Sequence, residues 1–361
     1  MEIKRCKITA LSPVHIGSKE EITPYEFVVM DDILYVINLH ALYANKRWGQ
    51  YLPYGTGELR IVRESLNRVV KEITKMGELE DFVYWKSKIS SKAKTVFDDL
   101  DRFKGIDLLP RAGKPYIPGS SVKGVLRTCV LNSLVEGFIP NESSKRNCKK
   151  WYYDPKRKNK HRPEMVEACI LDAIENDKYK FFLDLFQYFY VGDSSPVEET
   201  AIINFIESMP SNHSRKSKLN LPVEVIPEMS SVEIEIRFDW DRYVKVRKRK
   251  NKKEIISKMT IDDVLLMSSK WTQELIEKEL KRIDKISLDN NQRVRVKDFY
   301  TELKQLDLGE DKFLLRLGRF KSRHFNLIEK YSKEIKRYRD TKTLVLTETG
   351  RPLGWVVLEE L

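Results

Sequence analysis

The chain has 361 residues, of which 41% are hydrophobic and 33% are charged, a composition that can bury a core and that excludes a wholly disordered protein. No run approaches the roughly 18 uninterrupted apolar residues of a membrane span, and residues 1–10 lack the apolar core of a secretory signal, so we expect a cytoplasmic protein with no membrane partner. Lysine and arginine outnumber aspartate and glutamate by 66 to 54, which gives a net charge of +12 and favours a polyanionic partner.

The first half of the chain predicts strands followed by helices. Residues 2–10 read as a strand, and residues 27–30 and 33–37 flank Asp31-Asp32 as a two-residue hairpin. Apolar residues at spacings of three and four predict a helix over 57–76. Residues 81–103 are charged, and we expect them to be helical or irregular.

A further helix is expected to start at the Pro118-Gly119 turn, with Ser120 or Ser121 as its N-cap. Further along, the pattern predicts several elements: a long helix over 165–190, a hairpin within 196–227, a half-buried strand over 232–238, a helix over 271–286, and a closing hairpin of 343–347 with 355–358. We expect an N-terminal domain over 1–230, with helical insertions at about 45–115 and 140–190, and a C-terminal half over 231–361.

The positive charge is concentrated in two segments. Residues 145–162 hold nine basic residues and one acidic residue, and residues 245–253 hold seven basic residues and no acidic one. The remainder of the chain is close to neutral. This distribution is typical of nucleic-acid binding, although solvated lysine-rich loops would give the same counts.

Two motifs carry the chemistry of a phosphate-binding surface. The helix that opens at Gly119 offers free backbone N–H groups and a positive dipole end, and Lys123 and Arg127 are four residues apart, so they share one helix face. The segment 314–325 interleaves Arg316 and other cations with phenylalanines, a pattern in which cations contact phosphates and rings stack on bases. An ordinary capped helix and an ordinary strand-turn are the alternatives.

Catalytic signals are weak. The five histidines form no HxH or HExxH pattern, the cysteines form no CxxC pair, and no cofactor motif is present, so we expect neither a metal nor a cofactor. His15, in a strand-to-loop turn, could serve as a general base for RNA cleavage, although such a histidine is more often structural.

The combination of five segments resembles the RAMP (repeat-associated mysterious protein) superfamily of CRISPR systems. These segments are 11–17 (LSPVHIG), 117–127 (IPGSSVKGVLR), 191–194 (VGDS), 317–319 (LGR) and 352–356 (PLGWV). Their order, the chain length and the last segment are most similar to the Csm-type subunit that caps the crRNA 3′ end in type III-A effector complexes. The segment 117–127 is the most specific of the five.

The resemblance implies an α+β fold with a ferredoxin-like core related to the RNA-recognition motif. We expect two such halves, with helical and basic-loop insertions and a thumb hairpin. Together with the two basic motifs, the resemblance gives the following candidate RNA-binding residues: His15, Gly17, Ser18, Lys19, Gly119, Ser120, Ser121, Lys123, Arg127, Arg316, Arg319, Lys321 and Arg323, with Arg215, Lys216 and Lys218 in the thumb.

The function that the resemblance implies is a non-catalytic crRNA-binding cap that supports crRNA 3′ maturation and antiviral defence. Its implied partners are crRNA, target RNA, the repeating backbone RAMP subunit, other Csm subunits and host 3′ nucleases. The backbone subunits of these complexes cut RNA with an aspartate after the histidine-isoleucine-glycine turn, but here no aspartate precedes Asp31. The alternative is a metal-independent crRNA-processing endoribonuclease of the same superfamily, with His15 as its catalytic residue.

Overall fold

The computed structural model describes residues 1–53, 58–97, 105–137, 163–176, 178–204, 206–208, 222–252, 258–286, 288–318 and 344–361. Its strands are β1 (Glu2–Ala10), β2 (Glu21–Ile22), β3 (Phe27–Met30), β4 (Ile33–Ile37), β5 (Val83–Ile89), β6 (Ile106–Asp107), β7 (Arg111–Ala112), β8 (Lys114–Pro115), β9 (Ile174–Glu175), β10 (Lys178–Tyr179), β11 (Phe189–Val191), β12 (Ala201–Asn204), β13 (Ile206–Ser208), β14 (Pro222–Val225), β15 (Ser231–Phe238), β16 (Lys312–Arg316), β17 (Leu344–Leu346) and β18 (Trp355–Glu360).

The helices are α1 (Leu39–Ala44), α2 (Leu59–Lys75), α3 (Ser91–Val96), α4 (Gly119–Gly137), α6 (Pro163–Ile170), α7 (Trp240–Arg249), α8 (Ile261–Ile283) and α9 (Asn290–Gln305). Short 3₁₀ turns are η1 (Gly49–Tyr51), η2 (Leu79–Phe82), η3 (Phe181–Leu183) and η4 (Leu185–Gln187). The predicted α+β class is confirmed.

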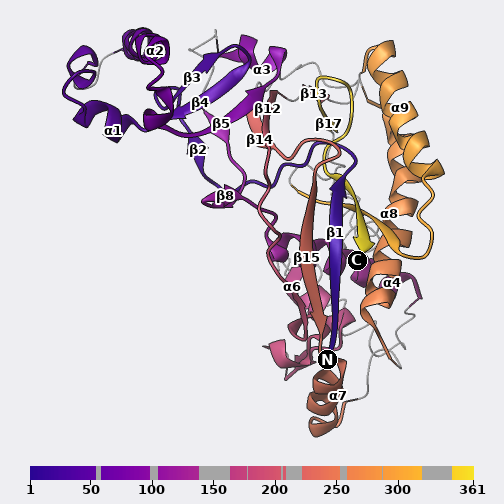
Figure 1. The fold of residues 1–361 in the computed structure, drawn as a ribbon. Coiled ribbons are helices and arrows are strands. Elements are labelled where there is room, and N and C mark those ends of the chain that lie inside the picture. The colour runs from indigo at the N-terminus through magenta and orange to yellow at the C-terminus, as the bar shows by residue number, and fades with distance from the viewer. Residues whose placement is uncertain are drawn as a thin grey trace, which may run out of the picture.

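The main sheet has five strands in the order β11-β15-β1-β18-β16. All of its neighbouring strands are antiparallel. Helix α4 lies between β1 and β11 in the sequence, and α8 lies between β15 and β16. This βαββαβ order is that of a ferredoxin-like core, with one additional edge strand. In Figure 1, β1 and β15 lie in front of α4 and α8, which cover the rear of the sheet.

The core lies between this sheet and the two helices. Alternating residues of β1 and β15, such as Ile8 and Ile236, point inward and join one buried cluster with Leu126 of α4 and Leu265 of α8. The alternation in β15, with Val232, Ile234, Ile236 and Phe238 buried, is what the period-two pattern predicts. A smaller cluster joins α8 and α9 to the β16–β18 edge.

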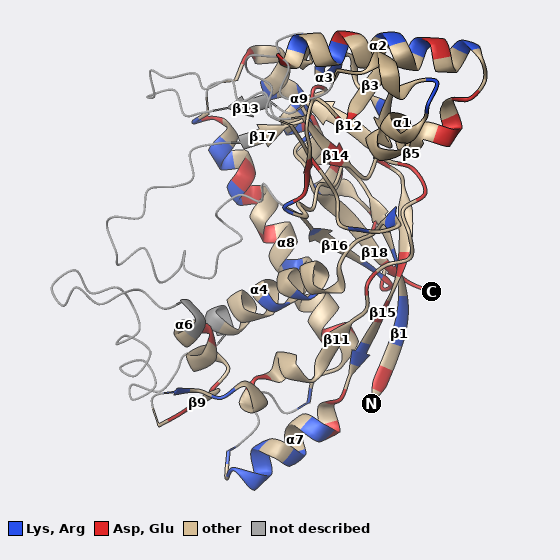
Figure 2. Cartoon of the chain, turned by 90° about the vertical axis from the view of Figure 1, so that its left-hand side faces the viewer, with Lys and Arg blue, Asp and Glu red and all other residues tan. Residues whose placement is uncertain are grey.

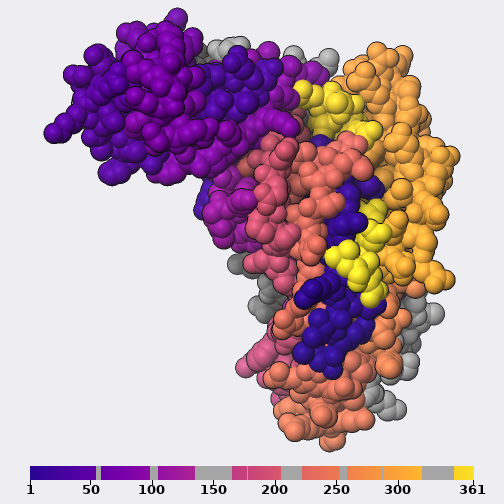
Figure 3. Space-filling model, in the orientation of Figure 1, coloured from indigo at the N-terminus to yellow at the C-terminus, as the bar shows by residue number. Residues whose placement is uncertain are grey.

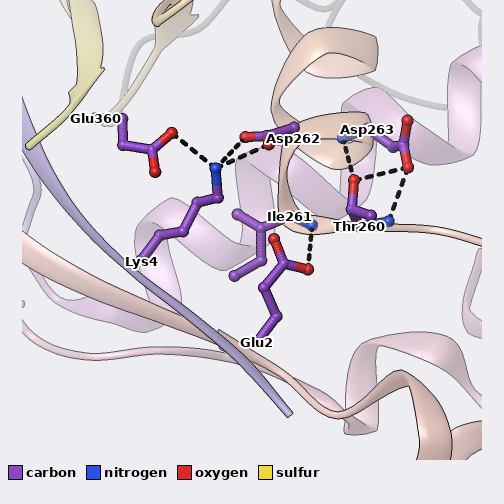
Figure 4. Close-up of polar contacts among 7 residues, drawn as sticks. All are labelled: Glu2, Lys4, Thr260, Ile261, Asp262, Asp263 and Glu360. Carbon is purple, nitrogen blue, oxygen red and sulfur yellow. Dashed lines mark hydrogen bonds and ion pairs between the residues drawn. The ribbon is translucent and has the colours of Figure 1, made fainter.

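A charged junction fastens the start of α8 to the sheet (Figure 4). The ammonium of Lys4 in β1 lies 2.7 Å from both Asp262 and Glu360, and the Glu2 carboxylate accepts from the Ile261 amide at 3.0 Å. Burial of Lys4 opposes its charged form, but the two carboxylates outweigh it and raise the pKa of Lys4 to about 12. Both ends of the chain are therefore tied to one helix.

A second, seven-stranded sheet has the order β2-β6-β14-β12-β5-β4-β3. Helix α3 packs on one of its faces and helices α1 and α2 pack on the other. We call this sheet with α1–α3 the lobe. Figure 3 shows it projecting sideways from the top of the elongated body that contains the main sheet, and Figure 1 places α7 at the opposite end of that body.

Several predicted elements are confirmed. The Asp31-Asp32 turn joins β3 to β4 with both residues at positive φ, 46° and 61°, as a two-residue hairpin requires. The predicted helix over 57–76 is α2, and the predicted strand over 232–238 is β15. The two runs within 196–227 pair as β12 and β14.

Other expectations need correction. Residues 81–103 contain strand β5 as well as helix α3, and the long helix expected over 165–190 ends at Ile170, after which the chain turns at Asp172 with φ 45°. The expected closing hairpin does not form, because β17 pairs with β13 while β18 pairs with β1 and β16.

The main sheet also takes strands from both sides of the expected boundary at residue 230. Strand β1 pairs with β15 and β18, so its hydrogen bonds join the two ends of the chain. The second sheet has a different strand order and is not a second ferredoxin-like half. Within the described ranges, no helix is both long enough and apolar enough to cross a membrane.

Candidate nucleic-acid interface

The start of helix α4 is fitted closely against the loop that follows β11. A Cβ atom on Gly119 would lie 2.1 Å from the Val191 carbonyl oxygen, so only glycine allows this approach. The Gly119 amide donates to the Asp193 carboxylate at 2.8 Å, and the Ile117 amide donates to Ser194 Oγ at 2.9 Å. Two motifs that are distant in the sequence, 117–127 and 191–194, therefore meet here. The expected N-cap, Ser120 or Ser121, is replaced by an aspartate from another segment.

Arg127 is partly buried and pairs with two carboxylates. Its Nε donates to Glu167 at 3.0 Å, and its Nη1 lies 2.8 Å from the buried Asp184. The guanidinium also lies over the ring of Phe186, at 5.3 Å. Burial opposes its charge, but Asp184 and Glu167 outweigh burial and raise the pKa of Arg127. These two carboxylates neutralise most of the positive charge of Arg127, and its predicted contact with phosphate stays a prediction.

Lys123 is half-buried and lies over the Tyr190 ring, with its ammonium 5.7 Å from the ring centroid. Burial lowers the pKa of Lys123; Asp184 opposes this effect and the guanidinium of Arg127 adds to it. Its ammonium remains near the edge of the sheet beside β11, and its predicted contact with RNA stays a prediction.

The His15 side chain is buried. Its Nδ1 lies 2.7 Å from the Glu224 carbonyl oxygen, and its Nε2 lies 3.4 Å from Asp107 Oδ2. The Glu224 carboxylate in turn accepts from Arg111 at 2.6 Å. The ring therefore holds the 11–17 turn against β14 and β6. Both ring nitrogens face protein atoms, which favours a structural role for the imidazole; the predicted contact of His15 with RNA stays a prediction.

Three turns that contain glycine pack against one another at the end of the main sheet. A Cβ atom on Gly318 would lie 2.3 Å from the His15 carbonyl oxygen, and one on Gly354 would lie 2.1 Å from that of Leu317. Both glycines have positive φ, 88° and 89°, a conformation that favours glycine. The Gly354 amide also donates to Pro13 at 2.9 Å. The motifs 11–17, 317–319 and 352–356 thus form one packed junction.

Arg316 is a predicted RNA-binding cation that the structure buries. Only 1% of the residue is exposed, its Nε donates to the Leu353 carbonyl at 3.2 Å, and its guanidinium lies 5.2 Å from the Trp355 ring centroid. Arg316 therefore supports the glycine junction from inside. Its predicted role in binding RNA stays a prediction.

The remaining candidates of the described segments lie nearer the surface. Lys19 and Ser120 are exposed, whereas Gly17, Ser18 and Ser121 are partly exposed and Gly119 is buried. Lys19 has a positive φ of 72°, and the Ser18 amide donates to Leu108 at 3.0 Å. The segment that begins at Leu108 continues directly into α4, so it connects the turn at Lys19 to the helix start.

Part of the predicted interface lies outside the described residues. This applies to Arg319, Lys321 and Arg323, to the thumb residues Arg215, Lys216 and Lys218, and to the basic segment 145–162. The described ranges contain no group of three or more His, Cys, Asp and Glu side chains that could hold a metal ion.

The open face of the main sheet carries charges of both signs. Lys7 pairs with Glu359 at 2.8 Å, and Arg237 pairs with Glu235 at 2.5 Å. Figure 2 shows the same mixture of blue and red along β1 and β15. This face therefore presents little net positive field to a polyanion.

Sequence reasoning missed the acidic side chains that bind the Gly119 amide, Arg127 and Arg111. Asp193 belongs to the 191–194 motif, and its place in that motif could have marked it as a cap for a nearby helix start. Asp184 and Glu224 carry no such local signal, because their partners lie 57 and 115 residues away in the chain.

The comparisons with known proteins agree with this arrangement of motifs. The model of the RAMP superfamily matches residues 7–325 of the chain. A protein of Methanocaldococcus jannaschii, named "CRISPR system Cms protein Csm5", is 24% identical over 323 residues, which are 88% of this chain and 70% of that protein.

Two solved structures have a similar fold. A chain of the cryo-EM structure of a Csm–crRNA–target RNA ternary complex in a type III-A CRISPR-Cas system matches with a TM-score of 0.66 at 20% identity, over 99% of this chain and 100% of that one. The crystal structure of T. onnurineus Csm5 matches with a TM-score of 0.59, also at 20% identity, over 97% and 99% of the two chains.

Proposed function

The chain belongs to the RAMP superfamily, and from this membership we propose that it is a crRNA-binding subunit of a type III-A CRISPR effector complex. In this proposal it caps the 3′ end of the crRNA and the end of the filament of backbone subunits. It acts in the cytoplasm, in antiviral defence.

One observation carries the proposal. The glycine junction gathers three motifs from positions 11–17, 317–319 and 352–356 around close backbone contacts, and two further motifs meet at the start of α4. Motifs separated by hundreds of residues become one connected structure. The likeness of the whole chain to a subunit of a Csm–crRNA–target RNA complex supports crRNA as the ligand.

The chemistry of the ligand agrees with this kind of surface. The guide part of a crRNA varies in sequence, so a general cap must contact phosphates and stack on bases and cannot read base edges. Lys19 and Ser120 are exposed in the described part of the interface, and they offer a cation and a hydroxyl for backbone contacts. Neighbouring Csm subunits, and host nucleases that trim the 3′ end, are the protein partners of this proposal.

We propose further that the chain does not cleave RNA. The support is the state of His15, whose two ring nitrogens face Glu224 and Asp107 in the protein interior. A general base must reach the hydroxyl that it deprotonates, and this ring is buried.

The first test uses the purified full chain and a 3′-labelled crRNA, with and without EDTA. One half of each sample is resolved on a native gel over a salt series, and the other half on a denaturing gel. Intact RNA in a salt-sensitive shifted band is the expected result. Defined cleavage products would overturn the non-catalytic assignment, and the absence of any shift would overturn RNA binding.

The capping role needs a second test in the assembled complex. Effector complexes are reconstituted with and without this chain, exposed to a 3′ exonuclease, and their crRNA 3′ ends are mapped by sequencing. We expect the chain to protect a defined 3′ end that is trimmed further in its absence. Identical 3′ ends in both complexes would contradict capping.

A further inference from the structure

Residues 245–249 of the second basic segment lie in helix α7, which is anchored by one buried arginine. Arg247 of α7 donates to the carbonyl oxygens of Leu171, Asp172 and Leu183 at 3.3–3.4 Å and to the Asp172 carboxylate at 2.6 Å. Lys252 contacts the same carboxylate at 3.0 Å. These contacts fix which face of α7 packs on the body, since Arg247 is only 1% exposed.

The opposite face of α7 is mostly cationic, and the one acid that it carries is Asp241 in the first turn. Arg242, Lys245, Lys248 and Arg249 are all exposed, and their spacing places them on the side of the helix away from Tyr243 and Arg247. Among the residues that the structure describes, none of these four cations forms an ion pair. In Figure 2 the last turn of α7 is blue and red appears only at its start, whereas α2 and α8 carry blue and red along their length.

Aromatic side chains adjoin the C-terminal end of α7. The 3₁₀ turn η3 packs beside α7, and the Lys250 ammonium lies 5.4 Å from the centroid of the Phe182 ring. The neighbouring Phe181 meets Phe182 edge to face, with centroids 5.7 Å apart, yet 63% of Phe181 is exposed. Phe181 is thus a largely exposed ring that is linked through Phe182 to the cation Lys250 at the C-terminal end of α7.

We propose that this α7 surface, formed by Arg242, Lys245, Lys248, Arg249, Lys250 and Phe181, is a second binding site for single-stranded RNA. The cations contact successive phosphates and the Phe181 ring stacks on an unpaired base. A cationic track beside an exposed ring is the arrangement with which proteins bind single strands without sequence preference. The inference rests on the proposed function, because it assigns a further part of the same RNA to α7.

The position of α7 separates this site from the motif-based interface. It lies at the end of the body opposite the lobe (Figure 1), whereas Lys19 follows the 11–17 turn, which is packed against strands β6 and β14 of the lobe. One RNA that contacts both regions must therefore run along the body. The α7 surface would hold the part of the strand beyond the motif-based interface.

The test compares two doubly substituted full-length proteins that each lose two exposed cations. One carries Lys245→Ala and Arg249→Ala on α7, and the matched control carries Arg68→Ala and Lys71→Ala on the exposed face of α2. The probe is a fluorescein-labelled 40-nucleotide oligouridine, whose affinity is measured by anisotropy between 50 and 300 mM NaCl. A thermal melt checks that each variant is folded; if the α7 variant melts early, Lys245→Gln with Arg249→Gln replaces it.

The expected result is a loss confined to the α7 variant. Because each lost phosphate contact on a single strand reduces the salt slope by about 0.7, the slope should fall by about 1.4, while the control keeps the wild-type slope. A wild-type slope in the α7 variant would overturn the α7 site and leave the proposed function standing. If the wild-type protein itself shows no salt-dependent binding, both fail.

Phe181 gives an independent measurement. Phe181→Leu keeps an apolar side chain but removes the stacking ring, so it should weaken oligouridine binding by about fivefold or more without changing the salt slope. A duplex RNA of the same length, whose bases are paired, should be insensitive to the substitution. Unchanged RNA affinity in all α7-surface variants, together with their failure to join the effector complex, would assign the surface to a protein partner and overturn the proposal.

Discussion

The start of α4 and the exposed face of α7 are both basic in the sequence, but the fold uses them in opposite ways. At α4, Arg127 is enclosed between Glu167 and Asp184. At α7, one arginine is similarly enclosed, and the cations around it, including Lys245 and Arg249, are left in solvent with no carboxylate partner in the described segments. Only the second arrangement has positive charge available for a polyanion.

This contrast shows why a count of basic residues is a poor guide to a binding surface. A buried, paired guanidinium stabilises the fold, and its removal leaves the carboxylate that it neutralised buried without a partner. An exposed cation contributes little to stability but releases a counterion when it meets phosphate. Substitution of a buried, paired cation should therefore lower stability, whereas substitution of an exposed cation should lower RNA affinity. Measuring both quantities for each variant distinguishes the two kinds of residue.

The largest effect is expected from Arg127→Ala. The substitution leaves the fully buried Asp184 without its cation, so the free energy of unfolding should fall by about 3–5 kcal/mol. Urea denaturation followed by circular dichroism measures it. If the variant keeps wild-type stability and instead loses RNA affinity, Arg127 is a phosphate clamp and the contrast with α7 is lost.

Within α7, Arg247→Ala and Arg249→Ala should behave differently although they are two residues apart. Removing Arg247 takes away a donor from the carbonyl oxygens of Leu171, Asp172 and Leu183, and we expect the free energy of unfolding to fall by about 2–3 kcal/mol. Removing the exposed Arg249 should change stability by less than about 0.5 kcal/mol. Equal losses in the same urea titration would show that both faces of α7 are structural.

Gly119→Ala tests the close fit at the start of α4. Its new Cβ would meet backbone oxygens of Val191 and Gly192 at 2.1 and 2.5 Å, so the segments must separate, at a cost of about 1–3 kcal/mol. The matched control is Gly124→Ala on the same helix, where a Cβ meets nothing within 4 Å and should stabilise the protein by about 0.5–1 kcal/mol. Melting temperatures that change in the same direction for both variants would contradict the close approach of Gly119 to the backbone of Val191 and Gly192.

The smallest effect is expected at Tyr179, whose hydroxyl donates to Asp184 at 2.8 Å. Burial and the charge of Asp184 raise the pKa of Tyr179 to about 12. The hydrogen bond therefore contributes fully to stability below the ordinary tyrosine pKa near 10. This contribution is lost as the pH rises through 12. Tyr179→Phe should cost about 1 kcal/mol at pH 8. The difference from wild type should shrink between pH 10 and 12; a constant difference would contradict the contact.

Local patterns predicted the local parts of this fold. The Asp31-Asp32 hairpin, helix α2 and strand β15 follow from turn chemistry and periodicity. The helix expected over 165–190 failed because its end depends on distant contacts: Asp172 turns the chain at φ 45° and is bound there by Arg247, 75 residues later. The motifs 11–17, 317–319 and 352–356 stood out in the sequence as marks of the family, but their meeting in one glycine junction was not predicted. The inward orientation of Arg316 and His15 was not predicted either, since burial depends on segments that meet only in the folded chain.

The central claim, that RNA meets the exposed cations of α7 and not the enclosed ones of α4, is tested most directly by lysine footprinting. The full chain is acetylated with a water-soluble reagent, with and without saturating oligouridine, and each lysine is quantified by mass spectrometry. We predict that RNA protects Lys245, Lys248 and Lys19 and leaves Lys71 on α2 as reactive as before. Equal acetylation of Lys245 and Lys248 in the bound and free protein would contradict the claim.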